Sequence, residues 1–377
     1  MNRRERLMAT LRGDPVDRPA VSFYELNGVD ENPDDPDPFN IYSHPSWRPL
    51  IELTRERTDR IVMRSVAYSS VLPNPVESIS ETETCVQDGS RLIVRRIRIG
   101  DRILTSRDRR DPDVNTVWTL EHLLKNVDDL RAFLEIPPPC PEGSVDTQAV
   151  LQAEVALGDT GIVMIDSPDP LCLAASLFDM GEYTVVAMTE PALFHELLER
   201  FASTLLPRTE AVAKALPGRL WRIYGPEYAA PPYLPPRRFR EYVCRYDTPM
   251  IEAIQRYGGY ARVHSHGKLK AILDDIVTMG ADGLEPIEPP PQGDVELKYV
   301  RERYGKNMVL FGNLEVSDIE TLPTPRFYEK VKRALDEGTS GSGRGFVLMP
   351  SSCPAGRELS LRTLKNYEKM VELVDRC

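Results

Sequence analysis

The chain has 377 residues, of which 41% are hydrophobic and 28% are charged, and its 47 basic and 58 acidic residues leave a formal net charge of −11. A chain of this length and composition can bury a large core, which excludes an intrinsically disordered protein. Because the charge is acidic and no block of basic residues occurs, we expect neither a nucleic-acid partner nor a membrane surface.

The sequence carries no signal for export or membrane insertion. Its charged amino terminus lacks the apolar segment of a secretory signal, and no run approaches the roughly 18 apolar residues of a spanning helix. The six cysteines do not have the spacing of a disulfide framework. We therefore expect a cytoplasmic protein.

Eight short runs of apolar or β-branched residues recur along the chain, and each is followed by a segment that favours a helix. The predicted strands are Ala20–Tyr24, Arg60–Met63, Gly161–Ile165, Leu220–Tyr224, Tyr260–His264, Gly283–Ile287, Met308–Phe311 and Gly345–Met349. The clearest helical patterns cover residues 147–157, 236–257, 267–279, 326–335 and 358–374. Eight strands that alternate with helices predict a (β/α)8 TIM barrel, and a doubly wound open sheet is the alternative.

One segment, Ser69–Arg110, interrupts the alternation after the second predicted strand. It alternates polar and β-branched residues, and Asp88-Gly89 is typical of a hairpin turn. We predict an antiparallel β-hairpin insertion here, and a helix over Trp118–Leu134 that leads the chain back to the barrel. Residues 1–377 are then expected to form one barrel domain that contains this insertion.

In such a barrel the functional groups lie where the strands end and the βα loops begin. Most of the eight predicted ends carry polar, titratable or metal-binding side chains. These are Glu25, Arg64, Asp166, Tyr224 with Glu227, His264 with His266, Glu285 with Glu288, Asn313, and Cys353.

The most specific local motif is His264-Ser-His266 at the end of the fifth predicted strand. In an extended strand, residues i and i+2 point the same way, so both imidazoles can face one ion. Imidazole suits zinc and other divalent transition metals, and Cys353 after the eighth strand offers a third ligand. The alternative is that His264 belongs to the core and His266 is a solvated loop residue.

Four further residues are candidates for catalysis. Glu227 and Glu288 lie in proline-rich loops, and either carboxylate could complete the metal site or act as a general base. We prefer Glu227, because the flanking prolines would fix a rigid loop over the pocket. Tyr224 and Asp166, at neighbouring strand ends, complete the candidate catalytic set. The alternative for the loop carboxylates is helix capping.

Motifs along the whole chain resemble the uroporphyrinogen decarboxylase-like superfamily. They are Arg3 to Pro19 (RRERLMATLRGDPVDRP), Pro236 to Val243 (PRRFREYV), the His264–Gly267 motif with Met279 to Pro286 (MGADGLEP), Leu310 to Asn313 (LFGN), and Gly345 to Cys353 with Asn366 to Met370 (NYEKM). The resemblance implies a (β/α)8 barrel, as the strand count does. Homodimers are compatible with it.

The resemblance is closer to one branch of that superfamily. The signature of true uroporphyrinogen decarboxylases near the first strand, Arg-Gln-Ala-Gly-Arg, is replaced here by Phe23 to Gly28 (FYELNG). The other branch comprises zinc-dependent, corrinoid-linked methyltransferases, which bind zinc through His-x-Cys at this strand end and a second Cys near the last strand. By position, His264 and Cys353 match that pattern, and His266 replaces the first cysteine. The insertion and Trp118 to Lys125 (WTLEHLLK) also resemble this branch.

The resemblance therefore implies a zinc-dependent methyltransferase with His264, His266 and Cys353 as ligands and Glu227 as fourth ligand or base. The methyl group would pass between a corrinoid and a thiol or a methoxylated small molecule. No Asp-x-His-x-x-Gly corrinoid motif occurs in the chain, so the corrinoid is expected on a partner protein. The alternatives are a metal-free decarboxylase of porphyrin biosynthesis and a non-catalytic barrel that binds a corrinoid protein.

Overall fold

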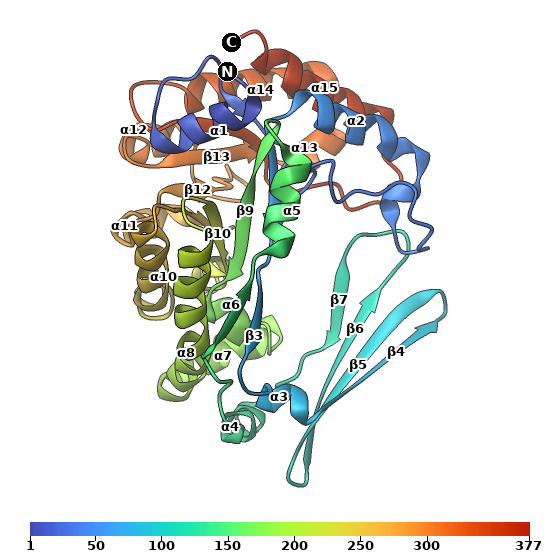
Figure 1. Cartoon of the computed structure of the whole chain (residues 1–377), viewed down its shortest axis with the longest axis vertical. Helices are drawn as coiled ribbons and strands as arrows, with labels where there is room; N and C mark the ends of the chain where they lie inside the picture. The colour runs from blue at the N-terminus through green and yellow to red at the C-terminus, as the bar shows by residue number, and fades with distance from the viewer.

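The computed structural model, which describes residues 1–377, contains a barrel-like sheet of eight parallel strands with helices around it (Figure 1). The strand order is β1-β14-β13-β12-β11-β10-β9-β2, and the Asp59 amide closes the ring by donating to the Val21 carbonyl oxygen at 2.7 Å. The strands are β1 (Ala20–Val21), β2 (Arg60–Arg64), β9 (Gly161–Pro168), β10 (Leu220–Tyr224), β11 (Tyr260–His264), β12 (Gly283–Glu285), β13 (Val309–Leu314) and β14 (Phe346–Pro350). All eight strands coincide with the eight predicted runs, so the barrel is confirmed and the open sheet is wrong.

Helices cover the outside of the barrel. They are α1 (Arg3–Arg12), α2 (Arg48–Arg57), α3 (Pro75–Ser78), α4 (Val127–Glu135), α5 (Gln148–Leu157), α6 (Pro170–Ala175), α7 (Met180–Thr189), α8 (Pro191–Ala215), α9 (Pro236–Phe239), α10 (Arg245–Arg256), α11 (Leu273–Thr278), α12 (Leu297–Tyr304), α13 (Val316–Thr321), α14 (Thr324–Gly338) and α15 (Leu361–Val374). The short 3-10 helices are η1 (Ile41–Ser43), η2 (Pro45–Trp47), η3 (Pro226–Ala229) and η5 (Leu269–Ala271), and a π-helical turn, η4 (Arg240–Cys244), joins α9 to α10. None of these helices is long and apolar enough to cross a membrane.

The insertion is confirmed and is larger than predicted. Strand β3 (Ala67–Ser70) pairs with β8 (Gly143–Asp146), and β4 (Ser80–Gln87), β5 (Ser90–Ile99), β6 (Arg102–Arg110) and β7 (Val117–Glu121) form an antiparallel sheet beside the barrel (Figure 1). Asp88 and Gly89 join β4 to β5 with φ of 50° and 80°, the left-handed pair that a tight hairpin turn needs.

The helix predicted over Trp118–Leu134 is wrong in its first half. Val117–Glu121 forms β7, because Val, Trp and Thr favour a strand that can pair with β6. The helix begins only after Asn126, whose side chain caps α4 by accepting a hydrogen bond from the Asp129 amide. The chain therefore returns to the barrel through a fourth sheet strand and a shorter helix.

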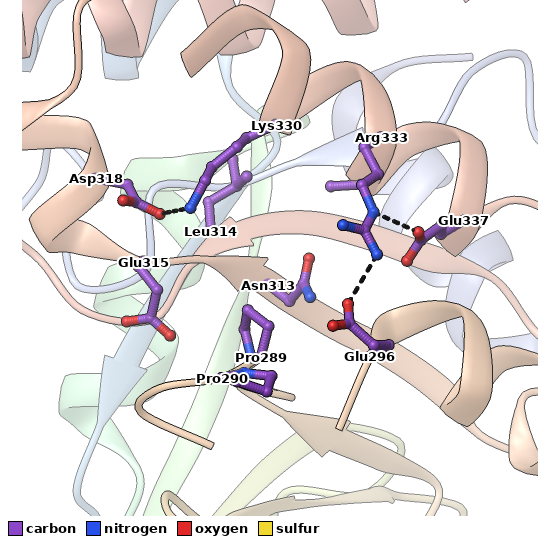
Figure 2. A pocket seen from close by; sticks show the side chains of 11 residues that line it. Pro289, Pro290, Glu296, Asn313, Leu314, Glu315, Asp318, Lys330, Arg333 and Glu337 are labelled. Carbon is purple, nitrogen blue, oxygen red and sulfur yellow. Dashed lines mark hydrogen bonds and ion pairs between the residues drawn. The ribbon is translucent and has the colours of Figure 1, made fainter. Parts of the chain in front are cut away.

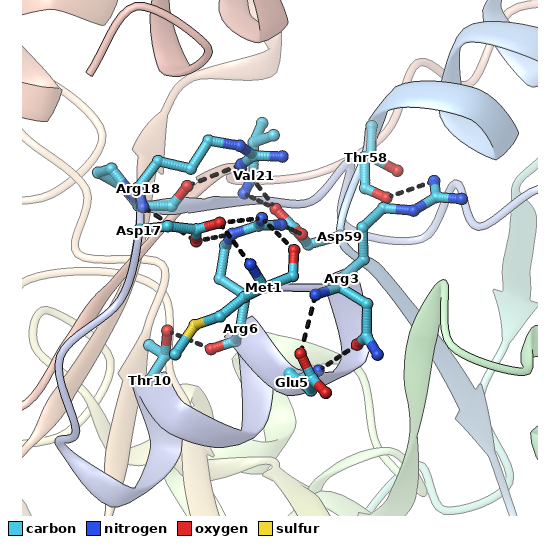
Figure 3. A network of polar contacts seen from close by, with 12 residues as sticks. Met1, Arg3, Glu5, Arg6, Thr10, Asp17, Arg18, Val21, Thr58 and Asp59 are labelled. Atoms are coloured by element: carbon cyan, nitrogen blue, oxygen red, sulfur yellow. Dashed lines mark hydrogen bonds and ion pairs between the residues drawn. The ribbon is translucent and has the colours of Figure 1, made fainter.

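A network of charged groups seals the amino-terminal end of the barrel (Figure 3). Arg6 donates to Asp17 at 2.7 and 2.9 Å and to Asp59 at 2.5 Å. Asp59, which is fully buried, also accepts from Arg18 at 3.0 Å and from the Val21 amide at 2.9 Å. The network ties α1 to the segments that enter β1 and β2, while Leu7 and Leu11 of α1 pack against the apolar barrel interior.

Candidate functional site

Two rows of side chains cross the carboxyl end of the barrel. The strand register aligns Arg222 of β10 with Asp166 of β9 and Arg262 of β11. One step further along the strands, Tyr224 is aligned with His264, and His264 with Glu285 of β12. Because residues i and i+2 share a face of a strand, both rows lie on the same side of the sheet.

The two histidines of the predicted metal motif lie side by side, with ring centroids 4.7 Å apart. Nδ1 of His264 is 2.9 Å from Oε2 of Glu285, and Nδ1 of His266 is 2.8 Å from Oε1 of Glu288. Since a carboxylate only accepts, each Nδ1 donates its proton and each Nε2 keeps a free lone pair. A carboxylate on the second ring nitrogen is the usual setting of a metal-binding histidine.

The Glu285 carboxylate behind His264 favours its charged form. Glu285 is fully buried, and although burial opposes its charge, Arg262 (Nη2 to Oε2, 3.1 Å) and His264 lower its pKa to about 2. Burial works to lower the pKa of His266, but the hydrogen bond and charge of Glu288 outweigh it and raise that pKa above its ordinary value. The pair therefore sits in a negative environment, which suits a cation.

Asp166 and Tyr224 belong to a separate arrangement around Arg222. The guanidinium donates to both oxygens of Asp166, at 2.6 and 3.0 Å, and to the hydroxyl of Tyr24. Its central carbon lies 5.0 Å from the ring centroid of Tyr224. Asp166 is thus fixed by a bidentate ion pair with Arg222, and the ring of Tyr224 lies beside that guanidinium.

Glu227 and Cys353 come from loops at other positions of the rim. Oε2 of Glu227 accepts from the Gly225 amide at 3.0 Å, so its own turn orients the carboxylate. Sγ of Cys353 donates to Oε2 of Glu25 at 3.2 Å, and burial, with the charge of Glu25, raises the pKa of the thiol well above its ordinary value. The structure therefore brings the two histidines together but leaves Cys353 on Glu25, and no three His, Cys, Asp or Glu side chains are clustered as a metal site.

Sequence reasoning did not include Arg222, Arg262 and Tyr24 in the candidate site. A usable signal was present, because each arginine is the only charged residue in an otherwise apolar strand (Leu220 to Tyr224, LWRIY, and Tyr260 to His264, YARVH). Charges are almost never buried without a partner, so an arginine in such a strand predicts a carboxylate on a neighbouring strand.

A pocket of about 150 Å³ opens beside these rows, between the loops after β12 and β13 and helix α14 (Figure 2). Its ionic groups are paired with one another: Lys330 with Asp318, and Arg333 with Glu296 at 2.9 Å and Glu337 at 2.6 Å. Glu315 also lines it, and burial beside Glu288 raises the pKa of Glu315 to about 7. Of the strand-end side chains named from the sequence, only Asn313 lines this pocket, and none of the candidate metal ligands or catalytic residues does, so we keep the candidate site at the strand ends.

Comparison with solved structures supports the barrel. A methyltransferase from Methanosarcina mazei is similar to 99% of this chain over 99% of its own, with a TM-score of 0.60 and 17% identity, which shows a shared fold. The crystal structure of D-psicose 3-epimerase in the presence of D-fructose aligns with 61% of this chain and 83% of its own at a TM-score of 0.37 and 8% identity, too low to support an argument. No curated protein sequence matches the chain.

The family model described as uroporphyrinogen decarboxylase (URO-D) matches residues 145–376. This segment covers more than half of the chain and runs from just before α5 to its carboxyl end, so it includes β9 to β14 and both rows of site residues. The match agrees with the order of motifs along the sequence, and the chain belongs to the uroporphyrinogen decarboxylase family.

Proposed function

We propose that the protein is a metal-dependent methyltransferase that moves a methyl group between a corrinoid on a partner protein and a thiol or methoxylated small molecule. The observation that carries this proposal is the histidine pair, in which Glu285 and Glu288 hold both Nδ1 atoms and leave both Nε2 atoms for a cation. The similar structure from Methanosarcina mazei is a methyltransferase, and this supports the reaction class.

The side chains present fit zinc or a similar divalent ion. His264 and His266 supply two nitrogen ligands, and Cys353 supplies a third ligand once its thiol leaves Glu25 and loses its proton. Two imidazoles and one thiolate leave the ion with a formal charge of +1. When bound, such an ion lowers the pKa of a coordinated thiol or polarises a substrate oxygen.

The remaining residues have roles that do not depend on the metal. Glu227 is our general base, because the Gly225 amide aims its carboxylate and no cation pairs with it. Asp166 is bound by Arg222 at two points, so we assign it to the orientation of that arginine. Tyr224 provides an apolar wall beside the row, and Glu288 orients His266.

The rival function is a metal-free decarboxylase that acts on a tetrapyrrole or another polycarboxylate. Such an enzyme needs free cations for the carboxylates of its substrate. The two arginines of the rows are already paired, Arg222 with Asp166 and Arg262 with Glu285. This observation favours the methyltransferase. An anaerobic incubation with uroporphyrinogen tests the rival, and we expect no coproporphyrinogen.

Metal analysis of protein purified without added metal tests the proposal directly. We expect about one zinc or other transition-metal ion per chain, and loss of that ion from His264→Ala. His44→Ala is the matched control, because His44 bonds only to Ser46 in a surface turn. Trace metal that His264→Ala leaves unchanged would overturn the proposal. Methyl transfer from free methylcobalamin to a small thiol then tests the reaction.

A further inference from the structure

The segments that carry or adjoin three carboxyl groups pack together, because α6 contacts η3, and η4 contacts both α6 and η3. Asp169 is the amino-terminal cap of α6, Asp247 lies on α10, and Glu227 lies in η3. The loop is packed directly onto Asp169, since a Cβ added at Gly225 would lie 2.0 Å from its Oδ1. The Asp169 amide also donates to the Tyr224 carbonyl oxygen at 2.9 Å. The Glu227 loop therefore rests on Asp169.

The two inner carboxyl groups are fully buried, and three of their four oxygens have no hydrogen-bond partner. Asp169 and Asp247 each have 0% exposure. Oδ1 of Asp169 accepts from the Cys172 amide at 2.5 Å, but its Oδ2 and both oxygens of Asp247 have no hydrogen-bond partner. Neither residue forms an ion pair with a lysine, an arginine or a histidine. A buried carboxylate without donors or a counter-ion is far less stable than the neutral acid.

The surroundings add negative charge, and the only compensation is the backbone amides at the start of α6, which bind Asp169. Burial raises the pKa of Asp169 well above its ordinary value, and the charges of Asp247 and Glu227 raise it further. Burial, with the charge of Glu227, does the same to Asp247. The other titratable groups whose charges couple to this cluster are Cys172, Tyr183, Tyr224, Tyr228 and Cys244, together with His266, which faces Glu227.

The π-helical turn η4 gives a structural reason for this placement. It ends at Cys244, three residues before Asp247, and adds a residue to one turn of the helical run from α9 to α10. The neighbours of Asp247 on α10, Tyr246, Met250 and Ile251, are buried. Asp247 therefore faces the core at a position where the pattern favours an apolar side chain. Such turns are frequent at functional sites.

We propose that Asp169 and Asp247 remain protonated acids at neutral pH and act as positioning residues that support the Glu227 loop without placing a buried negative charge beneath it. A negative charge on Asp247 would instead repel the carboxylate of Glu227 and disturb the loop that holds it. The role assigned to Glu227 rests on the proposed function, whereas the protonated state of the aspartates does not.

Infrared spectroscopy at pH 8 tests the protonated state. We expect carboxylic-acid C=O absorption in the wild type and weaker absorption in Asp247→Asn and in Asp169→Asn. Glu315→Gln is the matched control, because Glu315 has a pKa of about 7 and is mostly ionised at pH 8. If either Asn variant fails to fold, the other gives the same comparison. Absence of this absorption, or equal absorption in all variants, would overturn the proposal.

Stability as a function of pH separates this role from simple packing. The native state holds protons that the unfolded chain releases near pH 4, so the free energy of unfolding of the wild type falls as the pH rises above about 4. Asp247→Asn keeps the shape and a neutral donor but cannot ionise. We expect its stability relative to the wild type to increase from pH 5 to pH 9. A constant difference over that range would contradict the proposal.

The functional arm uses methyl transfer from methylcobalamin. If Glu227 is the base, Asp247→Asn retains kcat near neutral pH. Because Asn cannot ionise, we expect the fall of kcat/KM on the alkaline side to move to higher pH in this variant. An unchanged pH profile would overturn the positioning role. Wild-type protein with the infrared band but no transfer would instead disprove the proposed function and leave the protonated aspartates established.

Discussion

At the amino-terminal end of the barrel, Arg6, Arg18, Asp17 and Asp59 satisfy one another within 3.0 Å, whereas at the carboxyl end carboxylates lie behind histidines and buried oxygens lack donors. The first arrangement is complete without any ligand. The second leaves two imidazole nitrogen lone pairs free and one loop carboxylate, Glu227, that is held only by a backbone amide. In TIM barrels, residues at the amino-terminal end contribute mainly to stability, and active sites lie at the carboxyl end. The two ends of this barrel differ in the same way.

The largest effect is expected from Asp59→Ala at the amino-terminal end. The change leaves the buried guanidinium of Arg6 with only Asp17, so we expect a loss of about 3–5 kcal/mol in the free energy of unfolding. Denaturant unfolding measures it. Asp14→Ala is the control, because its pair with Arg12 is about half exposed and should contribute no more than about 1 kcal/mol. Equal losses in the two variants would remove the contrast.

At the carboxyl end the expected effect is on binding and not on folding. Glu288→Gln keeps the shape of the side chain but removes the charge that orients His266, so we expect metal affinity to fall about 10–100-fold. Competition with a chelator of known affinity measures this. Glu296→Gln, which removes a similar carboxylate from the paired pocket, should leave affinity unchanged. If both variants bind metal equally well, Glu288 does not support a ligand.

The amino-terminal network should lose stability as the pH falls, which is the opposite of the pH dependence expected from Asp169 and Asp247. The hydrogen bond from Arg6 lowers the pKa of Asp17, so its contribution to stability is complete above the unfolded value of roughly 4 and is lost as the pH falls through the folded value. Between about pH 4 and pH 2, the wild type should therefore lose stability more steeply than Asp17→Asn. Thermal unfolding across this range checks the slope, and parallel curves would contradict it.

The sequence was sufficient for the barrel because its strands are buried on both faces and appear as short apolar runs. The sequence-based prediction failed at Trp118–Leu134, where a strand is followed closely by a helix. Only the pairing of the first part with β6 identifies it as a strand. The histidine pair was predictable from the i, i+2 spacing. Its carboxylates were not, because the contacts of Glu285 and Glu288 depend on how β11 and β12 are aligned.

Asp247 shows the other limit of sequence reasoning. It lies within an apolar helical pattern that includes Tyr246 and Met250, and nothing in that pattern reveals the π-helical turn that precedes it. Its closeness to Asp169 joins residues 78 positions apart, because the π-helical turn η4 that precedes Asp247 packs against α6, which Asp169 caps. The cluster is formed by tertiary packing, so no local spacing in the sequence predicts it.

The smallest effect is expected from Lys330→Met in the pocket of Figure 2. Lys330 pairs only with Asp318, and its side chain is 50% exposed, so the loss of this ion pair should cost less than about 1 kcal/mol of unfolding free energy. Metal content and methyl transfer should not change, because the pocket contacts neither histidine. Asp318→Asn provides the reciprocal control. If both variants lost metal or methyl transfer but kept their stability, the functional site would include this pocket and would not be confined to the strand ends.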